Sequence, residues 1–187
     1  CIRDSRTSDQ VWVAFVYDTQ ILDMLPDRAD RRLQFIQSSL EEVHRGLQAA
    51  GSSLLTGHGD PVELIPALAR ALGVDRVIAA HDDDPYALRR DAEVQSRLHS
   101  DGRGWESVCD HVIRERRQVL TGGGDPFRVF TPYSRAWRQS VSEGEFIPCT
   151  PDFSALAPVP ASVPTPWRAG NHSLGEMGFQ PTDLWLE

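Results

Sequence analysis

The chain has 187 residues, enough for one domain of ordinary size with a tail or for two small domains. Its residues are 40% hydrophobic and 25% charged, which is typical of a globular protein and excludes a wholly disordered chain. Nineteen basic residues against twenty-seven acidic ones give a net charge of −8. That balance argues against this segment gripping a phosphate backbone by itself.

The sequence shows no feature of membrane insertion or export. It has no apolar run of about 18 residues and no charged-then-apolar leader with a small-residue cleavage site. Cys1, Cys109 and Cys149 are odd in number and far apart, which favours reduced thiols over a disulfide framework. We therefore expect a cytoplasmic protein without membrane contact.

The first half of the chain alternates predicted strands and helices. Residues 1–10 show no periodicity and predict an irregular arm. Residues 11–18 are almost continuously apolar, which is typical of a strand buried on both faces of a parallel sheet. A helix is predicted over residues 29–50, because apolar residues recur every three or four positions and Gly51 follows.

The alternation continues to about residue 120. A short strand over residues 53–57 precedes a helix that opens with Asp60 and Pro61 and ends at Gly73. Later predicted elements are a strand at 75–80, a helix opening at Asp84, and extended pieces at 107–112 and 117–120. This order predicts an α/β fold with an open parallel, Rossmann-like sheet.

The composition changes near residue 143. Six prolines lie within residues 147–166. We predict that the α/β domain spans residues 11–142. Residues 143–187 are then an extended, proline-rich linker, whose apolar anchors near the end are too few to form a core alone.

Ligands of open α/β sheets bind beyond the carboxyl ends of the strands, so the residues that follow each strand are candidates. These are residues 17–20, 58–60 and 81–84. His81 to Asp84 is the densest polar cluster, and it can be a metal site, a helix cap or a small-molecule contact. The cap is favoured, because consecutive residues of one extended segment do not easily converge on one ion.

No catalytic centre can be built from these signals. The glycine-rich stretch over residues 121–126 lacks the lysine and Ser/Thr of a phosphate-binding loop, which favours a flexible turn. A GxSxG nucleophile motif is also missing from the sequence. We predict no catalytic residue and no metal ligand in this chain.

Four segments, in the expected order, resemble the N-terminal α/β domain of the DNA photolyase and cryptochrome family. The most specific match is VLTGGGDPFRVFTPYSRAW, in which a turn leads into F-T-P-[FY]-x-x-x-W at the start of a helix. The other three are VWVAFVYDTQIL at residues 11–22, the helix–strand–helix stretch at 29–73, and DDDPYALRRDAEV at 82–94. The resemblance covers about residues 11–140.

The resemblance implies a two-part molecule. In many members the α/β domain holds an antenna chromophore, and a larger helical domain downstream holds FAD and binds DNA. This chain is then the light-harvesting domain of a DNA photolyase, a light-driven lyase that repairs pyrimidine dimers. A cryptochrome-type blue-light photoreceptor and a stand-alone nucleotide-binding α/β module are the alternatives. DNA contact is expected from the missing domain and not from this chain alone.

Two departures from the family pattern matter. The family begins with a central strand that carries W-F-R-x-D-L-R, and residues 1–10 do not match it. The chain also stops at Glu187, before the helical domain. We therefore expect a fragment truncated at both ends. Its strands at 11–18 and 75–80 would each keep an unpaired edge, which would leave the fold marginally stable or prone to aggregate.

The resemblance also implies where a chromophore would bind. Arg32 would bind a phosphate or carboxylate of the ligand; the alternative is that it is a solvated charge on its helix. Tyr86 would stack on a flat ring of the ligand; the alternative is that it packs in the core. A deazaflavin is favoured over a folate, because Tyr86-Ala87 stands where folate-binding members have Asn-Glu. Leu88 departs from the polar residue of some deazaflavin binders, so a flavin or no chromophore stays open. The implied contacts are Val16, Arg32, Asp82, Asp83, Asp84, Pro85, Tyr86, Ala87, Leu88, Arg89 and Arg90.

Overall fold

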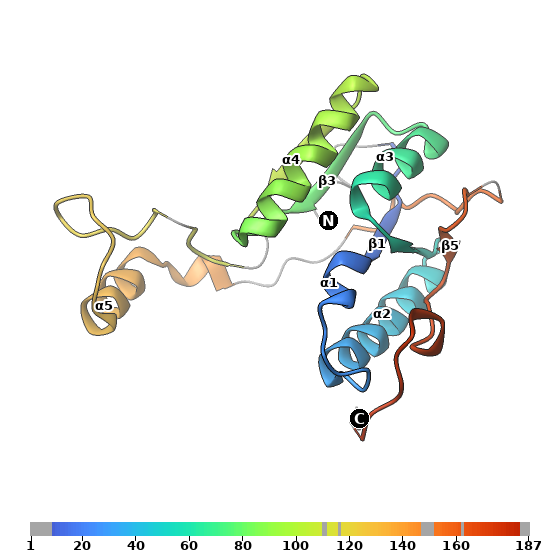
Figure 1. The fold of residues 1–187 in the computed structure, drawn as a ribbon. Coiled ribbons are helices and arrows are strands. Elements are labelled where there is room, and N and C mark those ends of the chain that lie inside the picture. The colour runs from blue at the N-terminus through green and yellow to red at the C-terminus, as the bar shows by residue number, and fades with distance from the viewer. Residues whose placement is uncertain (1–8, 110–111, 116, 147–151, 162, 184–187) are drawn as a thin grey trace.

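The computed structural model describes residues 9–109, 112–115, 117–146, 152–161 and 163–183, so most of the predicted arm at residues 1–10 lies outside the described residues. The strands are β1 (Val13–Asp18), β2 (Leu54–Gly59), β3 (Arg76–Ala80), β4 (Gly104–Val108) and β5 (Arg168–Ala169). The helices are α1 (Thr19–Asp23), α2 (Arg31–Ala49), α3 (Pro61–Leu72), α4 (Pro85–Ser100) and α5 (Phe130–Ser140), with short 3-10 turns at Glu143–Phe146 and Gly175–Met177. Parallel pairing of β1 with β2 and of β3 with β4 confirms the predicted α/β class (Figure 1).

The helix starts follow the capping signals in the sequence. Asp60 caps α3 by accepting the backbone N–H of Val62, and Gly73 ends that helix in the left-handed conformation at φ 66°. Asp84 caps α4 in the same way, and Asp30 caps α2. These three predicted helices are confirmed with boundaries shifted by one or two residues.

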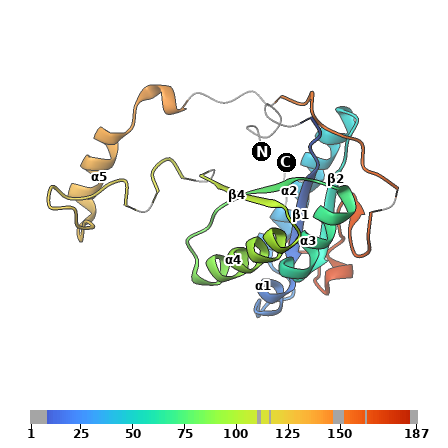
Figure 2. The same cartoon turned by 90° about the horizontal axis from the view of Figure 1, so that it is seen from above.

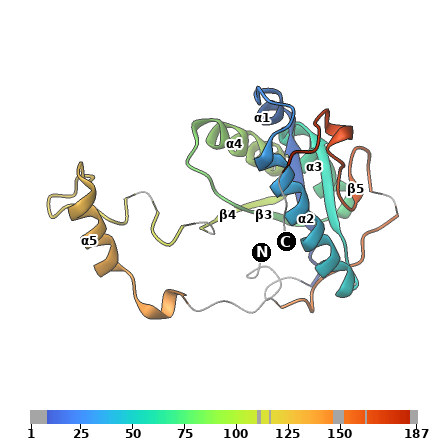
Figure 3. The same ribbon diagram turned by 90° about the horizontal axis from the view of Figure 1, so that it is seen from below.

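The extended pieces predicted after α4 are partly wrong. β4 begins at Gly104, three residues before the predicted strand, and ends at Val108. Residues 117–120 form turns and bends rather than a strand. These residues pair with no strand in the described part of the chain. They belong to what we call the outlying segment, which is the described part of residues 112–146. In all three views α5 stands away from the sheets (Figures 1, 2 and 3).

The strands form two sheets instead of one. Their orders are β1-β2-β5 and β3-β4, and in the described residues β1 does not pair with β3. As far as the structure describes the chain, β1 pairs along one side, with β2, and an isolated bridge between Val11 and Leu156 precedes it. β3 likewise pairs only with β4 among these residues. Within the described residues, β1 and β3 thus each have the unpaired edge that the sequence predicts.

The split sheet explains why β1 is less buried than its apolar sequence predicts. Only Tyr17 and Asp18 are buried in β1, while Ala14 is exposed and the other residues are partly buried. β2 lies between β1 and β5, and its first four residues are all buried. The prediction that residues 11–18 form a strand buried on both faces is therefore wrong for most of β1. The more deeply buried strand is β2, which has a neighbouring strand on each side.

The predicted extended linker is packed against the sheet over much of its described length. β5 pairs antiparallel with Leu55 and Thr56 of β2. We call residues 167–179 the returning segment; it contributes Leu174, Met177 and Phe179 to a core cluster with Tyr17 and Leu33. The prolines of residues 147–166 therefore lead back to the domain, which sequence composition alone does not reveal.

Trp167 joins the returning segment to the second core cluster, where it packs with Leu55, Leu64 and Leu68. It is 5% exposed, and its Nε1–H donates to the carbonyl of Leu64 over 3.1 Å. Gly57 permits this packing, because a Cβ there would lie 3.1 Å from the Trp167 ring. A third cluster, around Val94 and Leu98 of α4, covers the other sheet. Among the described residues no helix is both long and apolar enough to cross a bilayer.

The two unpaired strand edges predict low stability for the isolated chain. An exposed backbone edge adds no ladder hydrogen bonds and offers a template for association. In urea we expect a low midpoint or a broad transition, with light scattering that grows with protein concentration. A stable monomer that unfolds in one steep transition would contradict this expectation.

Replacing Trp167 tests whether the returning segment belongs to the core. Trp167→Ala removes a buried ring and its hydrogen bond, so we expect the free energy of unfolding to fall by about 3–5 kcal/mol. Phe153→Ala is the matched control, because Phe153 is 50% exposed. Equal, small effects of both substitutions in urea unfolding would show that the segment is an unattached linker.

Candidate ligand-binding site

Three helices begin at aspartates that follow the carboxyl ends of strands. Asp18 ends β1 and caps α1 by accepting the backbone N–H of Gln20 over 2.9 Å. Asp60 follows β2 and caps α3, and Asp84 caps α4 after β3. This edge is where open α/β sheets bind their ligands.

The side chains of Asp18, Tyr86 and Arg90 meet at this edge, and we call them the Asp18 cluster. The Tyr86 hydroxyl donates to Asp18 Oδ2 over 2.7 Å, and Arg90 Nη1 lies 3.6 Å from the same oxygen. The guanidinium of Arg90 also sits over the Tyr86 ring, 5.7 Å from its centroid. The cluster therefore joins the end of β1 to the first turns of α4.

Burial and the neighbouring carboxylate keep the Tyr86 hydroxyl protonated. Asp18 is only 6% exposed, and its carboxylate is compensated by the Tyr86 hydroxyl, the Gln20 N–H and the Arg90 cation. Burial raises the pKa of Tyr86, and the neighbouring Asp18 carboxylate raises it further. Tyr86 is thus a neutral hydrogen-bond donor at every pH at which the protein is expected to fold.

A second contact brings the end of β2 to the same edge. The side-chain amide of Gln20 lies 3.4 Å from Asp60 Oδ2.

Arg90 has a second acidic partner besides Asp18. Oδ1 of Asp91 lies 2.9 Å from Arg90 Nε and 2.8 Å from Nη2. The edge is therefore a connected polar surface with an aromatic ring and one cation at its centre.

Of the residues predicted to contact a chromophore, Tyr86 and Arg90 are the two whose side chains meet at the carboxyl edge of β1. The loop before them is a turn and a cap: Asp82 Oδ1 accepts the N–H of Asp84, and Asp84 Oδ1 accepts the N–H of Tyr86. Pro85 occupies the first position of α4, where its missing N–H costs nothing. Asp83 is exposed beside them. The cap reading of this segment is confirmed.

The other predicted contacts lie elsewhere. Val16 packs against the core cluster of Trp167, and Ala87 is buried at 3% exposure. Leu88 and Arg89 are exposed on α4. Arg32 is paired with Asp30, its own helix cap, over 2.5 Å, and this pairing is the main reason that the pKa of Asp30 falls to about 2.

Asp18, Gln20 and Asp60 are absent from the contacts implied by the family resemblance. The signal that identifies them is general, since each follows a strand at the carboxyl edge. The metal reading of His81 to Asp84 finds no support in geometry, because His81 Nε2 is instead 2.9 Å from Glu115. Throughout the part of the chain that is described, no three His, Cys, Asp or Glu side chains gather as metal ligands would.

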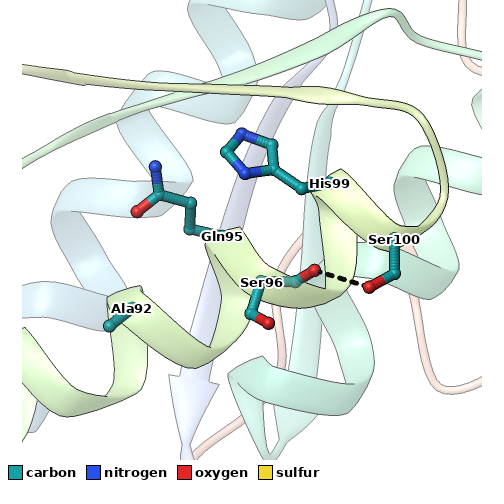
Figure 4. Close-up of a pocket in the computed structure, with 5 residues that line it drawn as sticks. All are labelled: Ala92, Gln95, Ser96, His99 and Ser100. Atoms are coloured by element: carbon teal, nitrogen blue, oxygen red, sulfur yellow. Dashed lines mark hydrogen bonds between the residues drawn. The ribbon is translucent and has the colours of Figure 1, made fainter.

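A shallow pocket of about 530 Å³ lies on the outer face of α4 (Figure 4). Its walls are Ala92, Gln95, Ser96, His99 and Ser100, and Ser100 Oγ donates to the carbonyl of Ser96. This pocket occupies the second half of the helix and contains no member of the Asp18 cluster. Its lining brings together no two groups that would act as nucleophile and base or as metal ligands, because His99 is its only titratable side chain.

Removing the Tyr86 hydroxyl tests how firmly the cluster is built. Tyr86→Phe leaves the buried Asp18 carboxylate without one donor, so we expect the free energy of unfolding to fall by about 1.5 kcal/mol. Tyr133→Phe on α5 is the matched control, because Tyr133 is 37% exposed. If urea unfolding of both variants matches the parent chain, the cluster contributes nothing to the fold.

The comparisons with known proteins agree with this architecture. The sequence profile of the family described as DNA photolyase matches residues 3–160. A deoxyribodipyrimidine photo-lyase of Synechococcus is 32% identical over 176 residues, which cover 84% of this chain and 36% of the relative. The chain thus spans about a third of the length of that relative.

Two solved structures share the fold. A bacterial class III photolyase from Agrobacterium tumefaciens superposes with a TM-score of 0.72 at 23% identity, over 93% of this chain and 33% of that one. An archaeal photolyase from Sulfolobus tokodaii, described with two FAD molecules and a novel light-harvesting cofactor, gives a TM-score of 0.55 at 19% identity, over 70% and 28%. With the family profile matching most of its length, this chain belongs to the DNA photolyase family.

Proposed function

We propose that this chain is the light-harvesting part of a DNA photolyase and that the Asp18 cluster borders the site of an antenna chromophore. The observation that carries the proposal is the Tyr86 ring with Arg90 over it, both held by a buried carboxylate at the carboxyl edge of β1. An aromatic ring fixed at both its face and its hydroxyl is a preorganised surface for another flat ring.

The charges around the cluster favour a ligand of low net charge. Asp18, Asp60 and Asp84 already occupy the positive ends of three helices, so these ends do not offer a free phosphate site. Arg90 shares its charge between Asp18 and Asp91. The edge therefore suits a flat ring with polar atoms on its rim better than a ligand that needs several cations.

Within that class we favour a deazaflavin over a flavin or a folate. The ring system of a deazaflavin is flat and needs no phosphate for stacking, which agrees with the charges at the edge. The Tyr86-Ala87 pair also departs from the Asn-Glu expected of folate-binding relatives. When bound, such a group would absorb light and pass on the excitation, while Tyr86 and Arg90 of this chain hold and orient it.

The redox and repair steps are proposed to belong to the rest of the protein. The chain spans about a third of its Synechococcus relative, and its net charge of −8 does not favour contact with a phosphate backbone. FAD and the damaged DNA would then bind to a helical domain beyond these residues. In this proposal the chain collects light and takes no part in bond cleavage.

Absorption titrations test the antenna role directly. The chain is titrated separately with a hydroxylated deazaflavin, with FMN and with a reduced folate, and the shift of each absorption band is recorded. We expect a saturable red shift with the deazaflavin and weaker shifts with the other two. Tyr86→Leu should weaken deazaflavin binding at least tenfold, which is about 1.4 kcal/mol.

Tyr133→Leu is the control, because it removes a similar ring from α5, away from the edge. It should leave the deazaflavin titration unchanged. Circular dichroism of both variants checks that the fold is intact before binding is compared. No shift with any of the three compounds would remove the antenna role.

A further inference from the structure

The returning segment is fastened to the sheet around one buried histidine. His172 is 6% exposed and lies between β5 and the 3-10 turn at Gly175–Met177. On one side of it Gly170 accepts the Thr56 hydroxyl over 2.5 Å, and on the other Leu174, Met177 and Phe179 enter the core. The segment lies beside α2 in Figures 1 and 3. Detaching it would therefore expose both a strand edge and part of the core.

Aromatic rings from both neighbouring strands enclose the imidazole. Tyr17 of β1 packs edge-on, with ring centroids 5.9 Å apart, and the His58 ring of β2 lies 6.0 Å away. The Tyr17 hydroxyl donates to Asn171 Oδ1, which also accepts the backbone N–H of His172. These contacts hold the histidine in one orientation against β1 and β2.

The imidazole makes a contact that requires its neutral form. Nδ1 of His172 faces Nη2 of Arg168, a group that can only donate, so Nδ1 must be the acceptor. Nε2 is buried. A backbone hydrogen bond with Thr56 and the charge of Glu176 act to raise the pKa of the ring, but burial and Arg168 lower it by more. A second proton would replace the acceptor with a cation directly facing another cation.

The surrounding charges do not favour that second proton. Arg168 is the nearest cation, and Glu176 is already engaged by Arg168 at 3.0 Å and by the hydroxyl and N–H of Ser173. His58 faces the ring from β2 and Tyr17 from β1, while His44 of α2 lies against Gly170, two residues away. The carboxylate that could pair with a protonated His172 is thus committed elsewhere.

We propose that His172 makes the returning segment a pH-sensitive latch, which is closed on the sheet while the imidazole is neutral and opens when acid protonates it. Opening of the latch would expose Trp167, the edge of β2 that β5 covers, and the apolar side chains of residues 174–179. Acidification would thereby loosen the C-terminal side of the domain while α4 and its sheet stay folded.

The direction of the effect follows from linkage. Burial lowers the pKa of His172 in the closed state, and the charge of Arg168 lowers it further. In the open state the imidazole is solvated and titrates near its ordinary value of about 6.5. The stabilisation of the closed state is therefore complete above about pH 6.5. Between that pH and the lowered pKa of the closed state, the closed-to-open ratio falls by up to tenfold for each pH unit.

Hydrogen exchange of the full chain, read by mass spectrometry and corrected for intrinsic pH dependence, tests the latch. Peptides that cover residues 167–179 should lose protection by up to tenfold per unit between pH 6.5 and 5.5. Peptides from α4 in the same sample are the internal reference and should keep theirs. Equal behaviour of the two regions, or a flat response of the returning segment from pH 7.5 to 5.5, would overturn the proposal.

Three variants separate the latch from general acid sensitivity. His172→Gln keeps an acceptor without a titrating group, so its protection should become independent of pH. Arg168→Gln removes the facing cation and should weaken the pH response, while burial of the imidazole keeps part of it. This second variant tests the proposal even if His172→Gln detaches the returning segment at every pH. His99→Gln, at an exposed position of α4, should behave as the parent chain. If both test variants keep the parent's pH response, His172 is not the switch.

Discussion

The fold depends on β2 having a partner along each edge. β1 pairs with it from one side and β5 from the other, and this double pairing buries Leu54, Leu55 and Thr56 almost completely. The second partner comes from residues more than a hundred positions later in the chain, beyond the proline-rich stretch. Trp167, stacked on Gly57, joins this late strand to α3. The domain is therefore built as much by the returning segment, which completes the sheet and the core, as by the βα alternation of the first half of the chain.

The candidate site follows from the same parallel arrangement. Because β1 and β2 run in the same direction, the aspartates at their ends lie at one edge, and each caps the helix that leaves it. α4 enters this edge from the other sheet through the Tyr86 hydroxyl on Asp18. A hydrogen bond to a buried carboxylate thus links the two sheets, which share no ladder of their own in the described residues.

Local signals in the sequence predict the helices well. α3 and α4 both open with Asp-Pro, and Gly73 ends α3, because cap geometry depends on a few neighbouring residues. Long-range features are harder to predict. β5 has two residues, and neither carries a strand signal; its pairing is imposed by the burial of Trp167 and Thr56. The stretch at residues 117–120 shows the opposite case, since apolar residues without a partner strand do not form one.

The sequence predicts the candidate site only in part, for a similar reason. Tyr86 and Arg90 are identified by resemblance, and their positions on one face of α4, four residues apart, bring both to the edge. Arg32 carries the positive charge expected of a residue that binds an anionic ligand group. Its guanidinium is instead paired with Asp30, two residues earlier in the chain. Asp18 is a plain helix cap in the sequence. It is the tertiary approach of α4 that makes it the centre of the cluster.

The distance along the chain between β2 and β5 also sets the order in which the domain can be completed. Until residue 179 has left the ribosome, Tyr17 and Leu33 lack the side chains of Leu174, Met177 and Phe179 that cover them. α3 and α4 with β3 and β4 use contacts much closer in sequence and can assemble earlier. Between the synthesis of β2 and that of β5, the nascent chain therefore displays β2 with one open edge, for which a chaperone or a neighbouring nascent chain competes.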